Sequence, residues 1–193
     1  MIAYKTKLEY EKLAIETPVK VDDVWEMKVT YDNEGLSFKT PSLSFDKRKQ
    51  TISFLSNKKA VFFQFVDDIE THIVDYLHSN SQDLFKGKVF TKERLKDSLI
   101  TSWDVTDDGI VSLNRECVTK DTKILSPFDE AITLEELSKN VICIMSLSSV
   151  TFQRNKFNIN YTITHIKSKK TVSNVTNFFE ETVKEEDMDF FNE

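Results

Sequence analysis

The chain is predicted to fold as a mainly antiparallel β domain with one main amphipathic helix. Two patterns in the 193-residue sequence carry this prediction. Apolar and polar residues alternate along 24–31 and 156–167, as they do in strands with one buried face. Between these segments, apolar residues recur at intervals of three and four through 62–78, which is the period of a helix packed on a sheet.

The strands of the N-terminal half are predicted from alternation and from the turn residues between them. Residues 24–31 place their apolar side chains on one face, namely Trp25, Met27, Val29 and Tyr31. A turn-forming stretch at 31–35 leads into extended chain at 36–39. Residues 51–55 and 59–63 are predicted to pair as a hairpin across the three residues between them.

The helices are predicted from periodicity and from capping. The main helix covers 62–78, and its repeating apolar residues are Phe62, Phe65, Val66, Ile69, Ile73, Tyr76 and Leu77. Residues 91–100 fit either a short helix or a connection between strands. Thr133 and Glu136 form a capping-box pattern, which predicts a short helix that ends near Lys139.

The clearest pair of strands is predicted at 141–152 and 156–167, with a turn at 153–155. On the second strand, one face collects Phe157, Ile159, Tyr161, Ile163 and His165. The stretch 104–129 is interpreted as a long insertion. Because no linker divides the chain, residues 1–179 are predicted to form a single β-rich domain.

Several classes of function are disfavoured because their sequence motifs are not found. Gly35, Gly87 and Gly109 are isolated, so neither a dinucleotide fingerprint nor a phosphate-binding loop is present. His72 and His78 are six residues apart on the predicted helix, which is poor geometry for a metal site. We expect a binding protein without cofactor or metal rather than an enzyme, while an enzyme of an unrecognised type stays open.

The cellular setting is predicted from the cysteines and the hydropathy. Cys117 and Cys143 do not form a disulfide framework, and each is interpreted as a small buried hydrophobe. No apolar run approaches the roughly 18–20 residues of a membrane span. The N-terminal segment is charged throughout, unlike a signal peptide. These features predict an intracellular protein in a reducing compartment, without a membrane partner.

Charge is segregated in the C-terminal part of the chain. Residues 180–193 hold seven acidic residues and one basic residue, a net charge of −6 that equals the net charge of the whole protein. Residues 138–179 hold six basic residues and no acidic one. The tail 180–193 is predicted to be disordered, and its candidate partner-binding residues are Asp187, Asp189, Phe190 and Phe191. The alternative is a tail that only solubilises the protein.

A surface for single-stranded nucleic acid needs cations for the phosphates and aromatic faces for the bases. The C-terminal hairpin offers both, and a second basic cluster follows Phe45. The candidate nucleic-acid-binding residues are Lys47, Arg48, Lys49, Arg154, Lys156, Phe157, Tyr161, Lys167, Lys169 and Lys170. The alternatives are that basic side chains protect sheet edges and that the two rings fill the core. Trp103 is likewise either a stacking residue or a core anchor.

Three segments and the acidic, aromatic-tipped tail resemble the single-stranded DNA-binding proteins of T-seven-like phages. The layout is more similar still to their counterparts in nucleocytoplasmic large DNA viruses. The segments are LSFKTPSLSF at 36–45, FFQFVDDIETHIVDYL at 62–77 and ICIMSLSSVTFQRNKFNINYTITHI at 142–166. The low glycine content and the stretch 104–129 depart from the pattern of that group.

The resemblance implies an OB-like antiparallel barrel or sandwich that coats single-stranded DNA in replication or recombination. It also implies a tail that contacts replication proteins. The charge pattern itself predicts that the acidic tail mimics the phosphate chain and competes for the basic groove in the free protein. For a viral protein, the location would be the host cytoplasm or the viral factory. The alternative is a viral structural or protein-interaction β domain that binds no nucleic acid. The oligomeric state, including a homo-oligomer, is left open.

Overall fold

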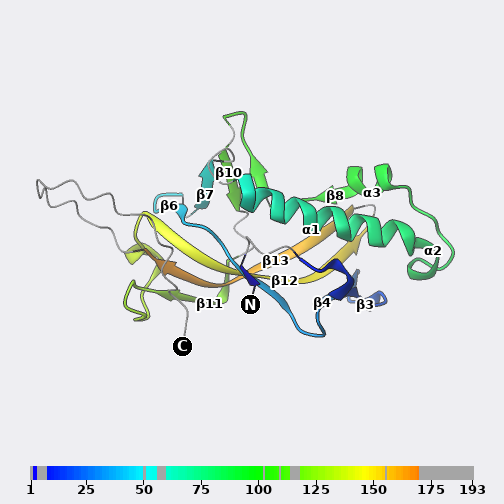
Figure 1. Ribbon diagram of the computed structural model, residues 1–193, viewed down its shortest axis with the longest axis horizontal. Coiled ribbons are helices and arrows are strands. Elements are labelled where there is room, and N and C mark those ends of the chain that lie inside the picture. Colours follow the sequence, from blue (N-terminus) through cyan, green and yellow to red (C-terminus); the bar gives the residue numbers. More distant parts are fainter. Residues whose placement is uncertain are drawn as a thin grey trace, which may run out of the picture.

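A computed structural model of the chain describes residues 2–3, 8–49, 51–55, 60–101, 103–108, 110–113, 118–154 and 156–169. Hydrogen bonds join its strands into one largely antiparallel network, and a long helix, α1, lies along one side of it (Figure 1). The predicted fold class, mainly antiparallel β with one main helix and short helices, is confirmed. The predicted tail 180–193 lies outside the described residues.

The elements follow one another along the chain without a repeat. The strands are β1 Ile2–Ala3, β2 Leu13–Ile15, β3 Val19–Val21, β4 Val24–Tyr31, β5 Leu36–Lys39, β6 Leu43–Asp46, β7 Thr51–Leu55, β8 Leu99–Ile100, β9 Trp103–Val105, β10 Ile110–Leu113, β11 Val118–Leu125, β12 Asn140–Gln153 and β13 Lys156–Ser168. The helices are α1 Ala60–Ser79, α2 Ser81–Leu84 and α3 Lys92–Ser98, with 3-10 turns at Tyr10–Lys12 and Leu134–Glu136. No helix in this part of the chain is long and apolar enough to cross a membrane.

The hairpin of β12 and β13 lies at the centre of the sheet (Figure 1). Its antiparallel pairing runs from Gln153 opposite Lys156 to Val141 opposite Ser168, which confirms the predicted strand pair. The other edge of β12 pairs in turn with β4, β5 and β6. The other edge of β13 pairs in parallel with β8 and β11. Both strands are therefore central, and strands from residues 24–125 pair with their outer edges.

A β-bulge corrects the predicted face of β13. Ile144 pairs with His165 and Met145 with Ile163, so Thr164 has no partner opposite it. An extra residue of this kind reverses the alternation of side chains beyond it. Ile166 is consequently buried in the core, whereas His165, which was predicted to share the buried face, is only partly buried.

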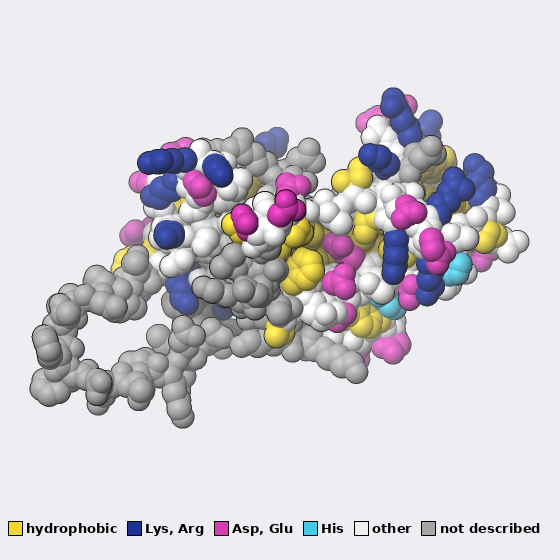
Figure 2. Space-filling model, turned by 90° about the horizontal axis from the view of Figure 1, so that it is seen from above, with side chains coloured by type: hydrophobic (Ala, Val, Ile, Leu, Met, Phe, Trp, Pro, Cys, Tyr) yellow, Lys and Arg dark blue, Asp and Glu magenta, His cyan; other side chains and the backbone are white. Residues whose placement is uncertain are grey.

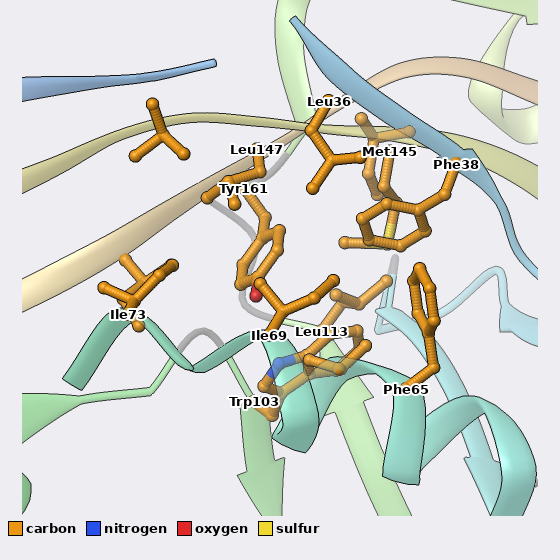
Figure 3. Close-up of a cluster of buried hydrophobic side chains, with 14 of the residues drawn as sticks. Leu36, Phe38, Phe65, Ile69, Ile73, Trp103, Leu113, Met145, Leu147 and Tyr161 are labelled. Carbon is orange, nitrogen blue, oxygen red and sulfur yellow. The ribbon is translucent and has the colours of Figure 1, made fainter. Parts of the chain in front are cut away.

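Helix α1 packs on the sheet through the apolar residues whose spacing predicted the helix. The ring of Phe38 on β5 lies 6.2 Å from that of Phe62 and 5.1 Å from that of Phe65. Figure 3 shows the helix residues Phe65, Ile69 and Ile73 opposite the sheet residues Leu36, Phe38, Met145, Leu147 and Tyr161. Burial of each such side chain contributes about 1.5–3 kcal/mol, so this layer is a main source of stability.

Two residues in this layer are polar as well as buried. Trp103 on β9 is 6% exposed and packs with its ring centroid 6.0 Å from that of Phe62, so it is a core anchor. Glu70 on α1 is 9% exposed. Burial raises the pKa of its carboxyl group to about 7, and the indole of Trp103 opposes part of that rise. Near neutral pH, this carboxyl group is therefore partly protonated.

Two further sequence predictions are corrected by the structure. The hairpin of 51–55 with 59–63 is wrong, because α1 begins at Ala60 and β7 pairs instead with β6 and β10. The stretch 104–129, interpreted as an insertion, contains β10 and β11, which pair with other strands of the sheet. Trp25 was predicted to face inward, yet 40% of its surface is exposed.

The segment 91–100, left open between a short helix and a connection, contains the short helix α3, and the capping box predicted at Thr133 is present. The side chain of Thr91 accepts a hydrogen bond from the backbone N–H of Arg94 and so begins α3. The backbone N–H of Thr133 donates to Glu136 Oε2 at 2.8 Å, as the capping box predicts, but the helix ends at Glu136 after one turn.

Cys143 is fully buried, and burial raises the pKa of its thiol to about 12. Cys117 and Gly109 lie outside the described residues.

Candidate nucleic-acid interface

A cavity of about 460 Å³ lies beside the turn of the β12–β13 hairpin. We call it the turn-end cleft, and it is lined by Lys88, Val89, Phe90, Arg94, Leu95, Ser98, Phe152, Arg154, Lys156 and Phe157. Four of these residues are cationic and none is acidic. Figure 2 shows Lys and Arg side chains gathered toward both ends of the molecule, and the right-hand group belongs to the end where Figure 1 places α2 and α3.

Local backbone geometry places the cations on the rim of the cleft. Arg154 adopts φ 58°, a left-handed conformation that suits the tight connection between the two strands. Gly87 adopts φ +85°, which glycine reaches without strain, and the chain turns there between α2 and α3. The carbonyl oxygen of Phe90 lies 2.7 Å from Nδ1 of His78, which ties this loop to the end of α1. All four rim cations are exposed.

Aromatic rings form the floor of the cleft. Phe152 and Phe157 are opposite each other in the hairpin, and their rings are stacked with centroids 5.3 Å apart. The ring of Phe85 meets those of Phe90 and Phe152 edge to face, each at 5.0 Å. The guanidinium group of Arg94 lies 5.2 Å from the centre of the Phe90 ring. Phe90 and Phe152 are only partly buried, so their surfaces remain accessible beneath the cations.

The predicted basic residues do not form one site. Arg154 and Lys156 line the turn-end cleft, whereas Lys169 pairs by its backbone with Asn140 at the opposite end of the hairpin. Strand β12 has 14 residues, which at about 3.3 Å per residue separates the two ends by roughly 45 Å. We call the second end the open end. Its cations are Lys47, Arg48, Lys49, Lys139 and Lys169.

Three predicted nucleic-acid-binding residues are buried. Phe157 is 0% and Tyr161 4% exposed, so neither ring offers a face to a base in this conformation. The side chain of Lys167 is also buried, and its Nζ donates to both carboxylate oxygens of Asp129 at 2.6 and 2.7 Å. These three side chains are part of the packed fold. For Phe157 and Tyr161, this is the alternative that the sequence left open, namely that the two rings fill the core.

Lys170 lies outside the described residues, and so do Asp187, Asp189, Phe190 and Phe191.

Seven of the ten residues that line the turn-end cleft were not predicted as site residues. The missed residues that matter are Lys88, Phe90, Arg94 and Phe152. A usable signal was the stretch KGKVFTK at 86–92, in which basic residues and an aromatic residue are interleaved around a glycine. Phe152 carried a similar signal in the stretch FQRNKF at 152–157, but its position in the cleft depends on contacts with Phe85, which is remote in the sequence.

Comparisons with known proteins give only distant likenesses. No family model matches the chain, and no curated protein matches its sequence. Among solved structures, the single-stranded DNA-binding protein from bacteriophage Enc34 is similar, with 12% identity, a TM-score of 0.42, and coverage of 89% of this chain and 96% of that chain. Its C-terminal truncation has 12% identity and a TM-score of 0.38, covering 83% of this chain and 95% of the other.

A third solved structure is that Enc34 protein in complex with single-stranded DNA, with 10% identity and a TM-score of 0.38. It covers 81% of this chain and 96% of that chain. Likenesses this distant assign neither a family nor a function to this chain.

Proposed function

We propose that the protein binds single-stranded nucleic acid, with DNA as the expected strand, in the turn-end cleft. The observation that carries this proposal is the composition of the cleft, in which four cations and no acid surround accessible aromatic rings. Cations hold the phosphates of an unpaired strand, and rings stack on its bases. Both requirements are met by side chains that line a single cavity.

The size of the cleft favours unpaired nucleotides. Its volume of about 460 Å³ lies in the range of roughly 300–1,000 Å³ that is typical of small-molecule pockets. Individual bases of a single strand fit such a space, whereas a double helix does not. In this proposal Lys88, Arg94, Arg154 and Lys156 contact phosphates, and Phe90 and Phe152 contact bases.

We extend the proposal to the whole chain. Residues 1–179 act as one DNA-binding domain that coats single-stranded DNA in replication or recombination, without catalysis of its own. The tail 180–193, with net charge −6, competes with DNA for the cationic rim in the free protein. Once DNA displaces the tail, Asp187, Asp189, Phe190 and Phe191 recruit replication proteins. The support for this part is the charge pattern of the sequence.

The deciding experiment is a binding titration with a labelled oligo-dT. Reversing two rim charges, in the double variant R154E/K156E, should lower the affinity at least tenfold. It should also reduce the slope of log affinity against log salt by about 1.4, because each phosphate contact on a single strand contributes about 0.7.

The matched control is R48E/K139E, which makes the same change of net charge at the open end. It should retain most of the affinity. Equal losses in both variants would mean that only the overall field attracts DNA. No loss in R154E/K156E would place the site elsewhere, and no binding by the wild-type protein would refute the proposed function.

A further inference from the structure

A row of side chains continues from the turn-end cleft across the sheet to Trp25. In the strand pairing, Phe157 is opposite Phe152, Phe152 is opposite Trp25, and Trp25 is opposite Lys20 on β3. Residues directly opposite each other project to the same face of a sheet. The row therefore runs along one face, from the closed core at Phe157 through the partly buried Phe152 to the exposed Trp25.

The exposure of Trp25 is unusual for its residue type. Tryptophan is highly buried on average, yet 40% of this side chain is open to solvent. The ammonium group of Lys86 lies 5.7 Å from the centre of the ring, within the range of a cation–π contact. Lys86 comes just before Gly87 and Lys88, so the loop that supplies the cleft with Lys88 also places a cation over Trp25.

Basic and acidic side chains lie at different positions around Trp25. Lys20 and Lys86 are exposed on the side of the ring that faces the loop and β3. Asp22 and Asp23 occupy the turn between β3 and β4, where they would repel a phosphate chain. The two lysines would attract a polyanion that leaves the cleft, and the two aspartates would repel it from the turn.

We propose that Trp25 is a second stacking site for an unpaired base, with Lys86 and Lys20 holding the neighbouring phosphates. The bound strand then runs from the turn-end cleft over the end of β12 and onto β4. Neighbouring strands of a sheet are about 4.8 Å apart, so Trp25 is within reach of about one or two nucleotides from Phe152. This inference rests on the proposed function and deepens it, because it names the path of the strand beyond the cleft.

The two tryptophans provide a direct test in the full-length protein. Trp25 is exposed, whereas Trp103 is 6% exposed and lies in the core. Stacking of a base on Trp25 should quench its fluorescence when oligo-dT is added. The variant W25F should bind with nearly wild-type affinity, since phenylalanine also stacks, but should lose most of the quenching.

Affinity and strand length supply the second readout. W25A should weaken binding roughly five- to hundred-fold, which corresponds to the usual value of one stacked base. Its affinity should also stop rising at a shorter oligonucleotide length than that of the wild-type protein. K86A should reduce the salt slope by about 0.7 through the loss of one phosphate contact. V19A, at another exposed apolar position on β3, should change neither quantity.

The outcomes separate this inference from the proposed function. If the wild-type protein binds and R154E/K156E does not, while W25A binds normally and no quenching is seen, then Trp25 is not on the path and the inference is overturned. That result would favour a protein partner for the exposed ring. If the wild-type protein binds no strand, both proposals fail together. Melting temperatures of the charge variants and of V19A should match that of the wild-type protein, because their replaced side chains are exposed. For W25A the melting temperature is measured beside the affinity, so that a loss of stability is not mistaken for a loss of binding.

Discussion

The two ends of the β12–β13 hairpin both carry cations, but the surroundings of those cations differ. At the turn end, Arg154 and Lys156 stand at the mouth of a cavity with an aromatic floor. At the open end, Nζ of Lys47 donates to the carbonyl oxygen of Glu135 at 2.9 Å, and the buried Lys167 is held by Asp129. The open end uses part of its positive charge to fasten loops to the sheet.

This difference shows that a count of positive charges is a poor guide to a binding site. The open end has more predicted basic residues than the turn end, where only Arg154 and Lys156 were predicted, and three of them are consecutive in the sequence. What distinguishes the turn end is the combination of exposed cations with accessible rings around one cavity. The predictions below probe that distinction, beginning with the largest expected effect.

The largest expected effect is the loss of stability when the buried ring of Phe157, in the floor of the cleft, is removed. Phe157→Ala should lower the free energy of unfolding by about 3–5 kcal/mol, because the fully buried ring would leave a cavity beside Phe152. Arg154→Ala at the same turn is exposed and should change it by less than about 0.5 kcal/mol. Chemical denaturation measures both. A Phe157 variant as stable as the wild-type protein would restore the stacking role for this ring.

The buried carboxyl group of Glu70, on α1, should make the stability of the protein depend on pH, whereas the exposed cations at the two ends should not. The folded-state pKa of Glu70 is raised from 4.5 to about 7, so stability should fall as the pH rises through this window and stay low above it. Glu70→Gln keeps the shape without the charge and should add roughly 2–3 kcal/mol at pH 8. Melting curves at pH 4 and pH 8 test this, and DNA affinity should not change. Equal gains at both pH values would exclude ionisation as the cause.

The accessible rings should matter for binding rather than for stability. Phe90→Ala should weaken oligo-dT binding by about 1–3 kcal/mol if its ring stacks on a base. The matched control is Phe128→Ala, which removes a ring that is 70% exposed and lies beside Asp129, on the side of the open end. Affinity and melting temperature are measured together. Equal losses of affinity in the two variants would remove the distinction between the ends.

The smallest effect is expected from the tail. Deleting residues 180–193 should raise DNA affinity severalfold at 0.01 M salt, where the screening length is about 30 Å, and much less at 0.15 M, where it is about 8 Å. Replacing Phe190 and Phe191 by alanine keeps the charge and should leave the affinity unchanged. Anisotropy titrations at the two salt concentrations decide the matter. A truncated protein that gains nothing at low salt contradicts the competition model.

The sequence predicted the elements that have a long periodic pattern of their own, but not the short hairpin expected at 51–55 and 59–63. Helix α1 and the strands β12 and β13 lie within two residues of their predicted positions, because each has a long periodic stripe. Periodicity says which residues share a face but not how far the covering layer extends. Met27 lies under that layer and Trp25 does not, although the two residues belong to the same stripe.

The candidate site was only half predictable, for a related reason. Arg154 and Lys156 stood out because they flank a predicted turn, whereas the cleft exists only where the loop at 86–90 meets the hairpin. Such a meeting joins residues more than 60 positions apart, and no local pattern encodes it. The burial of Lys167 could not be predicted either, because it depends on Asp129, which is 38 positions away in the sequence and holds its Nζ.

The central place of β12 has a consequence for how the chain is made. Strands β4, β5 and β6 all pair with β12, which begins only at Asn140. A ribosome that adds about 5–20 residues per second completes β12 roughly 6–25 s after β4. During that interval the earlier strands expose edges that can pair with other chains. We therefore expect nascent chains to depend on chaperones, and fragments that end before Asn140 to aggregate instead of folding.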